Sequence, residues 1–340
     1  MKKRLFASLL CLALCLGLLP GTAWANGDGG VEYIERGWDG SAVTEQPKTV
    51  DTYTPINEST VTWNGSTTGG WYVAQGDITI NQRVTVTGDV RLILTDGCTL
   101  TVNGGIQVAA GNSLTIYGQS DGADTMGKLT ASITSENTDL YNAAIGGNAG
   151  ETGGTLTVYG GAVKATVTIT NDFGSASETS QGGGAYGAAI GGGGTENGNG
   201  GNGGTTVIYG GAVEATVTIT NDFGSASETS QGDSAYGAAI GGGGSETGNG
   251  GDGGTITIFG GTVRAESTLG AGIGGGSGGS GGGDGGKVTI SGGAVRAESY
   301  YGGGIGGGAH LSGGDTGGDG GNITLPRGTG VGPKGSRGPP

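Results

Sequence analysis

The sequence predicts an all-β fold, a right-handed parallel β-helix (solenoid) with long glycine-rich loops behind an N-terminal signal peptide. Residues 155–204 and 205–254 are almost the same fifty residues written twice, differing at nine positions. Chains that grow by copying a short unit form stacks in which each copy buries its apolar face against its neighbours. A strand of the type T-x-T-x-[YF]-G-G-x-V-x-A, followed later by I-G-G, carries the repeat beyond these two copies.

The spacing of one isoleucine shows how the repeat accommodates insertions. This residue recurs with intervals of 45, 50, 33 and 32 residues, at Ile145, Ile190, Ile240, Ile273 and Ile305. Around it, short segments alternate between apolar and polar residues, which is typical of strands with one buried face. Each unit has three such segments, separated by Gly-Gly corners and a glycine loop. We therefore expect one winding of a three-sided coil per unit, with aliphatic side chains inside and most of the 87 glycines at corners and loops.

The N-terminal residues have the pattern of a secretory signal peptide. Basic residues at positions 2–4 precede an apolar run from Leu5 to Leu19, and Ala23-Trp24-Ala25 supplies a small-x-small cleavage pattern. We assign residues 1–25 to this signal and 26–62 to an extended polar leader or linker. The β-helix is expected over 63–325, with Trp63, Trp71 and Tyr72 closing its first end, and a disordered tail over 326–340.

Charge and cysteine content exclude several classes of partner. Removing the signal leaves 12 basic against 29 acidic side chains, which argues against nucleic acid and anionic lipid. We expect no membrane insertion after signal cleavage. Cys98 is the one cysteine beyond the signal, so no internal disulfide is possible, and its strand pattern favours a buried apolar role over a reactive thiol. These features suit a secreted, extracellular protein. They are also compatible with association to the cell surface.

The run GGWYVAQGDITINQRVTVTGDVRLILTDGCTLTVNGGIQVAAGNSLTIYG, with the later GAAIGGG and GGTVRAES units, resembles a family of secreted proteins. These are glycine-rich, carbohydrate-binding-domain or adhesin-like surface proteins of gut Firmicutes with a pectate-lyase-like right-handed β-helix. The resemblance covers roughly residues 63–325 and implies the architecture more specifically than any activity. Larger members carry wall-attachment modules, and this chain shows none.

Aromatic residues are the candidate ligand-binding groups. Tyr117, Tyr159, Tyr209 and Phe259 each end a T-x-T-x strand before a glycine, so stacking would align them in a ladder on which sugar rings could pack. The alternative, which we favour, is that the rings stack on one another and cover the Gly-Gly corner. Tyr186 and Tyr236 lie in the variable insertions, where we expect exposure.

Catalytic and metal sites receive little support from the sequence. Lys164, Glu214, Arg264 and Arg296 occupy one repeat position with changing sign, which indicates a solvated outward position, and Arg83 and Arg91 are also expected to be exposed structural residues. We predict no catalytic residue and no cofactor. Calcium is the one ion considered, with Asp315 and Asp319 as weak ligand candidates, because the glycine loops lack the apolar residue that calcium-binding turns require.

These patterns favour a non-enzymatic, secreted surface or adhesin-like protein that binds carbohydrate through a side of the β-helix. The partner would be a polysaccharide or a host or cell-surface glycan. Two alternatives stay open: a polysaccharide lyase or glycoside hydrolase on a β-helix, and a purely structural surface or matrix repeat protein.

Overall fold

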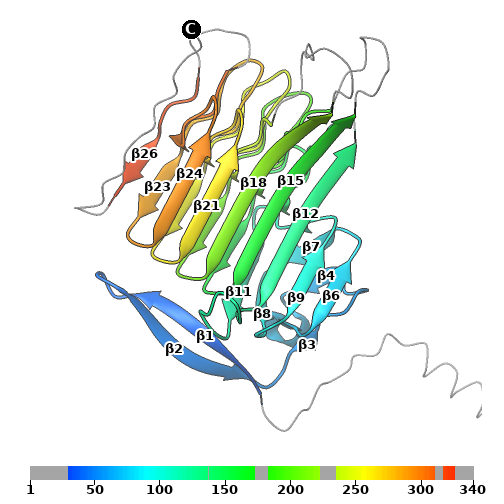
Figure 1. Ribbon diagram of the computed structural model, residues 1–340, viewed down its shortest axis with the longest axis vertical. Helices are drawn as coiled ribbons and strands as arrows, with labels where there is room; N and C mark the ends of the chain where they lie inside the picture. Colours follow the sequence, from blue (N-terminus) through cyan, green and yellow to red (C-terminus); the bar gives the residue numbers. More distant parts are fainter. Residues whose placement is uncertain (1–29, 137, 173–182, 223–234, 311–316, 326–340) are drawn as a thin grey trace, which may run out of the picture.

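The computed structural model describes residues 30–136, 138–172, 183–222, 235–310 and 317–325, which form an all-β molecule (Figure 1). The predicted signal peptide and tail lie outside these residues. Three long parallel sheets contain all strands except a two-stranded hairpin, β1 (Val31–Trp38) and β2 (Val43–Val50). The arrangement is consistent with the expected β-helix or solenoid. Within the described ranges, no helix has the length and apolar character needed to cross a membrane.

The three sheets are named here by number, and their strands follow chain order from one end to the other. Sheet I contains β4 (Thr62–Asn64), β7 (Val84–Thr87), β10 (Ile106–Gln107), β13 (Ile145–Gly146), β16 (Ile190–Gly191), β19 (Ile240–Gly241), β22 (Ile273–Gly274) and β25 (Ile305–Gly306). Sheet II contains β3 (Thr54–Pro55), β5 (Trp71–Ala74), β8 (Asp89–Leu94), β11 (Ser113–Gly118), β14 (Thr155–Val158), β17 (Thr205–Ile208), β20 (Thr255–Ile258), β23 (Lys287–Ile290) and β26 (Asn322–Thr324). Sheet III contains β6 (Asp77–Ile80), β9 (Thr99–Val102), β12 (Lys128–Glu136), β15 (Ala162–Asp172), β18 (Ala212–Asp222), β21 (Thr262–Ser267) and β24 (Ala294–Ser299).

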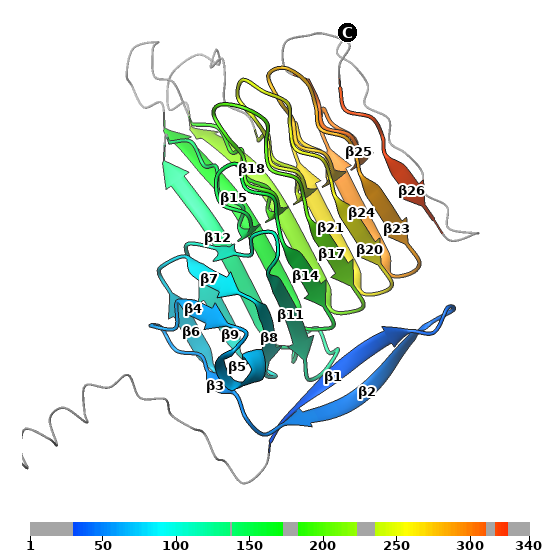
Figure 2. The same ribbon diagram turned by 180° about the vertical axis from the view of Figure 1, so that it is seen from behind.

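From β5 onward the chain visits sheets II, III and I in turn, so each repeat unit adds one strand to each sheet, and the strands stack side by side (Figures 1 and 2). The register confirms the predicted isoleucine column: Ile145 pairs with Ile190, Ile190 with Ile240, and the pairing continues through Ile273 to Ile305. These side chains are buried except at Ile305, where the column ends and the side chain is half-buried. Cys98 is buried as predicted.

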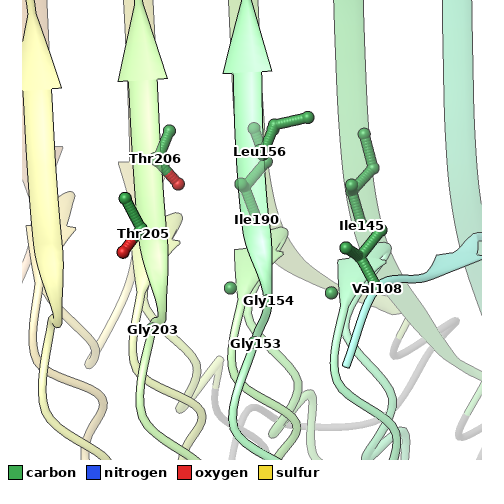
Figure 3. Close-up of a pocket in the computed structure, with 11 residues that line it drawn as sticks. Val108, Ile145, Gly153, Gly154, Leu156, Ile190, Gly203, Thr205 and Thr206 are labelled. Atoms are coloured by element: carbon green, nitrogen blue, oxygen red, sulfur yellow. The ribbon is translucent and has the colours of Figure 1, made fainter. Parts of the chain in front are cut away.

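One column of the core contains a polar residue. Thr206 on β17 occupies the position that Leu156 and Ile256 occupy on the neighbouring strands, and it is almost fully buried. A cavity of about 10 Å³ lies beside it, lined also by Ile190 and by Gly203 (Figure 3). Within the described residues, the Thr206 hydroxyl has no hydrogen-bond partner.

The glycine-rich loops that connect sheet I to sheet II are packed layers rather than open surface loops. Two rows of glycines alternate as hydrogen-bond donors and acceptors along the stack, with N···O distances of 2.8–3.0 Å. We call this set the glycine slab: Gly193, Gly243, Gly276 and Gly308 in one row, and Gly201, Gly251, Gly283 and Gly318 in the other. All but Gly318 are buried. The slab thereby satisfies the backbone groups that burial would otherwise leave unpaired.

The slab requires glycine because of close backbone approach. A Cβ atom added at Gly243 would overlap the carbonyl oxygen of Gly193, and one added at Gly276 would overlap that of Gly243. The glycines were expected at corners and loops, and they do lie there. Their burial in a layer that excludes side chains is the part that the sequence pattern did not indicate.

The segment expected to be an extended polar leader instead contains the hairpin. Strands β1 and β2 pair antiparallel from Val31 opposite Val50 to Trp38 opposite Val43, with a turn at Asp39-Gly40. The Asp39 side chain accepts hydrogen bonds from the backbone N–H groups of Ser41 and Ala42, which stabilises the turn. The hairpin was not predicted because most residues of this segment are polar, although Val31 and Tyr33 alternate with Glu32 and are buried.

Candidate functional site

The predicted aromatic ladder lies where the strands of sheet II end. Tyr117, Tyr159, Tyr209 and Phe259 stack in sequence, with ring centroids 5.0, 4.9 and 4.8 Å apart and interplanar angles of 18–21°. These spacings match the separation of about 4.8 Å between neighbouring strands. The rings therefore stack on one another, which was the favoured of the two predicted arrangements, and inside the ladder the ring faces contact other rings.

The ladder continues an apolar line on the outer surface of sheet II. Tyr117 is in register with Ile93 on β8, and Ile93 with Val73 on β5. Both aliphatic side chains are buried although they lie outside the core of the coil. We call the whole line the aromatic stripe: Val73, Ile93, Tyr117, Tyr159, Tyr209 and Phe259.

The hairpin covers the aromatic stripe, and Figure 2 shows it lying along the ends of the sheet II strands. The Tyr33 ring lies 4.8 Å from that of Tyr117, and the Trp38 ring lies 5.3 Å from that of Phe259 in a stacked arrangement. Five strand residues span roughly 17 Å, close to the roughly 14 Å of three strand separations. Strand β1 can therefore run along the stack and place an aromatic ring at each end of the ladder.

Between these two contacts, a buried arginine attaches the hairpin to the stack. Arg36 donates from Nε to Glu45 Oε1 at 2.8 Å, from Nη2 to Asp121 Oδ1 at 2.6 Å, and from Nη1 to the carbonyl oxygen of Tyr159. The Arg36 side chain is almost fully buried, whereas both carboxylates are about half exposed. It packs against the Gly-Gly corners, where a Cβ on Gly160 or Gly210 would collide with it.

The environment of the stripe keeps its phenols neutral. Desolvation by burial is the largest cause that raises the pKa of Tyr33, Tyr117 and Tyr159 above the ordinary value for tyrosine. The nearby Glu35 carboxylate raises the pKa of these phenols further. At neutral pH the stripe is therefore an uncharged aromatic surface edged by charged groups, among them the Lys48–Glu35 ion pair on the hairpin.

A second ladder corrects the expectation that Tyr186 and Tyr236 are exposed. Both are buried, and Tyr186 stacks with Tyr141 at 5.1 Å and with Tyr236 at 4.4 Å. Leu269 in the next winding packs in the same cluster. The described residues around Tyr186 and Tyr236 stack in register, so each ring is covered by the equivalent residue of the neighbouring winding.

The charged residues singled out in the sequence divide into two groups. Lys164, Glu214, Arg264 and Arg296 share one outward register position, as predicted, and the Lys164 Nζ and Glu214 Oε1 atoms lie 3.1 Å apart. Arg83 differs from the expectation of exposure, because its guanidinium is partly buried between windings.

Arg83 donates to the carbonyl oxygens of Gly104 and Ala143 at 2.9 and 3.0 Å and to Asn148 Oδ1 at 2.8 Å. Desolvation lowers the pKa of Arg83 to about 10, so the side chain stays cationic at neutral pH. Arg91 lies over the Trp71 ring at 5.5 Å and donates to the carbonyl oxygen of Gly69. Both arginines therefore connect neighbouring windings.

The acidic residues of the glycine loops form a backbone-capping row. The backbone N–H of Asp319 donates to Asp284 Oδ1 at 2.8 Å, that of Asp284 to Asp252 Oδ1 at 3.0 Å, and that of Asp252 to Asn202 Oδ1 at 2.9 Å. Asp315, the other weak calcium candidate, lies outside the described residues. In the part of the chain that is described, no three side chains of the metal-ligating types come together.

Comparisons of the chain with protein-family models, with curated proteins and with solved structures find no match. The aromatic stripe and the hairpin that covers it are therefore the candidate functional site. Sequence reasoning missed Tyr33, Arg36 and Trp38. The signal that could have found them is the Asp39-Gly40 turn between two segments of strand length.

Proposed function

We propose that the chain is a secreted, right-handed parallel β-helix that acts as a non-enzymatic, adhesin-like surface protein and binds carbohydrate along one side of the helix. The observation that carries the proposal is the aromatic stripe, whose rings lie at regular spacing and end at Phe259, against which the hairpin residue Trp38 stacks. Repeated aromatic side chains suit a polymer whose own units repeat. The signal-peptide pattern and the resemblance to adhesin-like surface proteins support the extracellular assignment.

The end of the stripe near Phe259 is the favoured contact region. Tyr33 and Tyr117 at the other end are buried, whereas Trp38, Tyr209 and Phe259 are half-buried and next to the exposed turn of the hairpin. Tyr209 lies between the rings of Tyr159 and Phe259, and Phe259 lies between Tyr209 and Trp38. A sugar would therefore pack on the outer face of Trp38 and contact the ring edges of Tyr209 and Phe259. We assign the carbohydrate contact to Trp38, Tyr209 and Phe259.

Polysaccharide-affinity electrophoresis and a glycan array with the secreted chain test the proposal. We expect retardation by at least one plant, microbial or host glycan, and its loss in Trp38→Ala. The matched control is Tyr301→Ala, which removes an exposed aromatic far from the stripe. Circular dichroism of each variant separates loss of binding from loss of folding. Absence of retardation across the panel, or equal effects of both substitutions, would overturn the carbohydrate assignment.

A second candidate function is that of a purely structural repeat protein. One observation favours it: the rings inside the ladder stack face to face on one another, and Trp38 covers Phe259. In that case the stripe serves to hold the hairpin and the protein acts as a rigid element of a surface or matrix. The Trp38→Ala variant would then lose hairpin docking without changing any glycan interaction.

A further inference from the structure

The same dipeptide, Asn-Gly, occurs six times in the part of the chain that the structure describes. In this dipeptide the asparagine side chain can react with the backbone nitrogen of the glycine, because glycine has no Cβ to hinder the approach. The reaction requires an asparagine side chain that is free to rotate and a glycine N–H that is not held in a hydrogen bond. The six pairs are Asn64-Gly65, Asn103-Gly104, Asn197-Gly198, Asn199-Gly200, Asn202-Gly203 and Asn249-Gly250.

In four of these pairs, the glycine N–H is held by a hydrogen bond to a neighbouring winding. The donor and acceptor residues, with N···O distances of 2.8–2.9 Å, are Gly65 and Thr87, Gly200 and Asn249, Gly203 and Asp252, and Gly250 and Gly281. The side chains of Asn199 and Asn202 are held as well, since each Oδ1 atom accepts a hydrogen bond from a backbone N–H of the next winding. These four pairs can therefore react only after the stack opens locally.

The fifth pair, Asn103-Gly104, is restrained by side-chain contacts although Asn103 is exposed. The Nδ2 atom of Asn103 donates to Asn81 Oδ1 at 2.8 Å. The Gly104 backbone packs closely against Arg83: an added Cβ would lie 2.4 Å from the Arg83 backbone nitrogen, and the Gly104 carbonyl oxygen accepts from Arg83 Nη1 at 2.9 Å. Neither residue of this pair can move freely toward the other.

Asn197-Gly198 is the pair that lacks these restraints. Both residues are exposed, and neither the Asn197 side-chain amide nor the Gly198 N–H has a hydrogen-bond partner within the described ranges. Gly198 has a φ of 89°, and an added Cβ would meet no atom within 4 Å, so the turn projects into solvent. The Gly198 carbonyl oxygen is held, because it accepts a hydrogen bond from Ser245 Oγ at 2.6 Å. The Gly198 nitrogen is thus accessible to the side chain that precedes it.

The next copy of the repeat differs at this turn. Thr247 stands there at the position of Asn197, and the Gly248 N–H donates to Ser245 Oγ at 2.8 Å. In the first copy, the equivalent hydroxyl of Thr195 donates instead to the carbonyl oxygen of Asn197 at 2.8 Å. One copy of the fifty-residue unit therefore presents a reactive pair at this turn, and the other copy does not.

We propose that Asn197 is a site of spontaneous deamidation in the folded protein. The Gly198 nitrogen bonds to Cγ of Asn197, the Cγ–Nδ2 bond breaks, and the Gly198 amide proton leaves with Nδ2 as ammonia. Water then opens the resulting succinimide to aspartate or isoaspartate, which adds one negative charge next to Glu196. The inference does not depend on the proposed carbohydrate function, because this loop precedes β17 and the aromatic stripe follows it.

Peptide mapping of the folded chain during incubation at mildly alkaline pH tests the proposal. Short digestion at acidic pH with a protease that cleaves after glutamate releases residues 197–214 as one fragment, which contains Asn197, Asn199 and Asn202. Electron-transfer fragmentation in a mass spectrometer then assigns the converted residue and distinguishes isoaspartate from aspartate. We expect Asn197 to convert at least about ten-fold faster than Asn199 or Asn202, because hydrogen-bonded backbone reacts only through local opening.

Two controls separate the effect of the fold from that of the local sequence. A synthetic peptide of residues 192–206 is the unfolded reference, in which the three asparagines should convert at rates within about three-fold of one another because each precedes a glycine. The variant Asn197→Thr carries the residue of the next copy; it should abolish the fast conversion and leave Asn199 and Asn202 unchanged. Equal rates at the three positions in the folded chain, or faster conversion at Asn103 than at Asn197, would overturn the proposal.

Discussion

The glycine slab and the aromatic stripe lie at the two ends of the sheet II strands. Both pack neighbouring windings against each other, the slab through backbone atoms and the stripe through large side chains. Before each strand, the slab packs backbone against backbone and excludes side chains. After each strand, the stripe packs large rings at the same spacing and is covered by the hairpin. The comparison shows the effect of in-register stacking: a residue type at one repeat position recurs along the whole axis. The loops before the sheet II strands therefore form a continuous layer of glycine backbone, and the residues after these strands form a continuous row of aromatic rings.

The comparison predicts that the slab tolerates substitution least. Gly243→Ala should reduce the free energy of unfolding by at least about 3 kcal/mol, because its Cβ would overlap the Gly193 carbonyl and the next winding prevents relaxation. The measurement is the urea unfolding midpoint followed by circular dichroism. The matched control is Gly320→Ala, where an added Cβ meets no atom within 4 Å, and where we expect a change within about 0.5 kcal/mol. Similar losses in both variants would show that the slab is not a close-packed layer.

Substitutions that weaken the contact between the hairpin and the aromatic stripe should release the hairpin without unfolding the stacked sheets. Arg36→Ala removes the buried guanidinium and its hydrogen bonds to Glu45 and Asp121, and we expect the hairpin docking to weaken by about 2 to 3 kcal/mol. Limited proteolysis should then cut within residues 31–50 while the strands of the stack stay protected in hydrogen exchange. The control is Lys48→Ala, which removes an ion pair on the hairpin at the solvent surface and should leave the protease pattern unchanged. Cooperative unfolding of the whole chain in Arg36→Ala would contradict a separable cover.

Alkaline pH provides a third distinction, because the stripe contains ionisable rings and the slab has none. Burial raises the folded-state pKa of Tyr117 above its unfolded value of about 10. The neutral phenol therefore contributes stability that is present in full below pH 10 and is lost as the pH rises above it. The part of the tyrosinate absorbance that comes from the buried phenols should appear only together with loss of the β-sheet signal. In Tyr117→Phe the loss of stability above pH 10 should be smaller, and full ionisation of the tyrosines in the folded state near pH 10 would contradict their burial.

The parts of the fold that repeat were predictable from local pattern, and the parts that depend on neighbours were not. The isoleucine column and the Lys164 to Arg296 row follow from period-two alternation. The alternation sets the register because a shift by one residue would move every apolar side chain from the core to the outer face. The burial of Tyr186 has no local signal, since its cover is Tyr236 in the following winding. The hairpin contact has none either, because Arg36 and Tyr159 are far apart in the chain and meet only after both have folded.

The smallest expected effect lies where the glycine loops meet sheet II. Thr206 occupies an apolar column there, beside a cavity of about 10 Å³ that is close to the minimum size for one water molecule. Thr206→Val keeps the shape and removes a buried hydroxyl, so we expect the free energy of unfolding to increase by about 1 kcal/mol. Thr205→Val on the same strand is the control, because Thr205 is only half-buried. An unchanged unfolding midpoint in Thr206→Val would mean that a water in the cavity satisfies the hydroxyl, and the junction between slab and sheet would then be closed by that water rather than by side-chain packing.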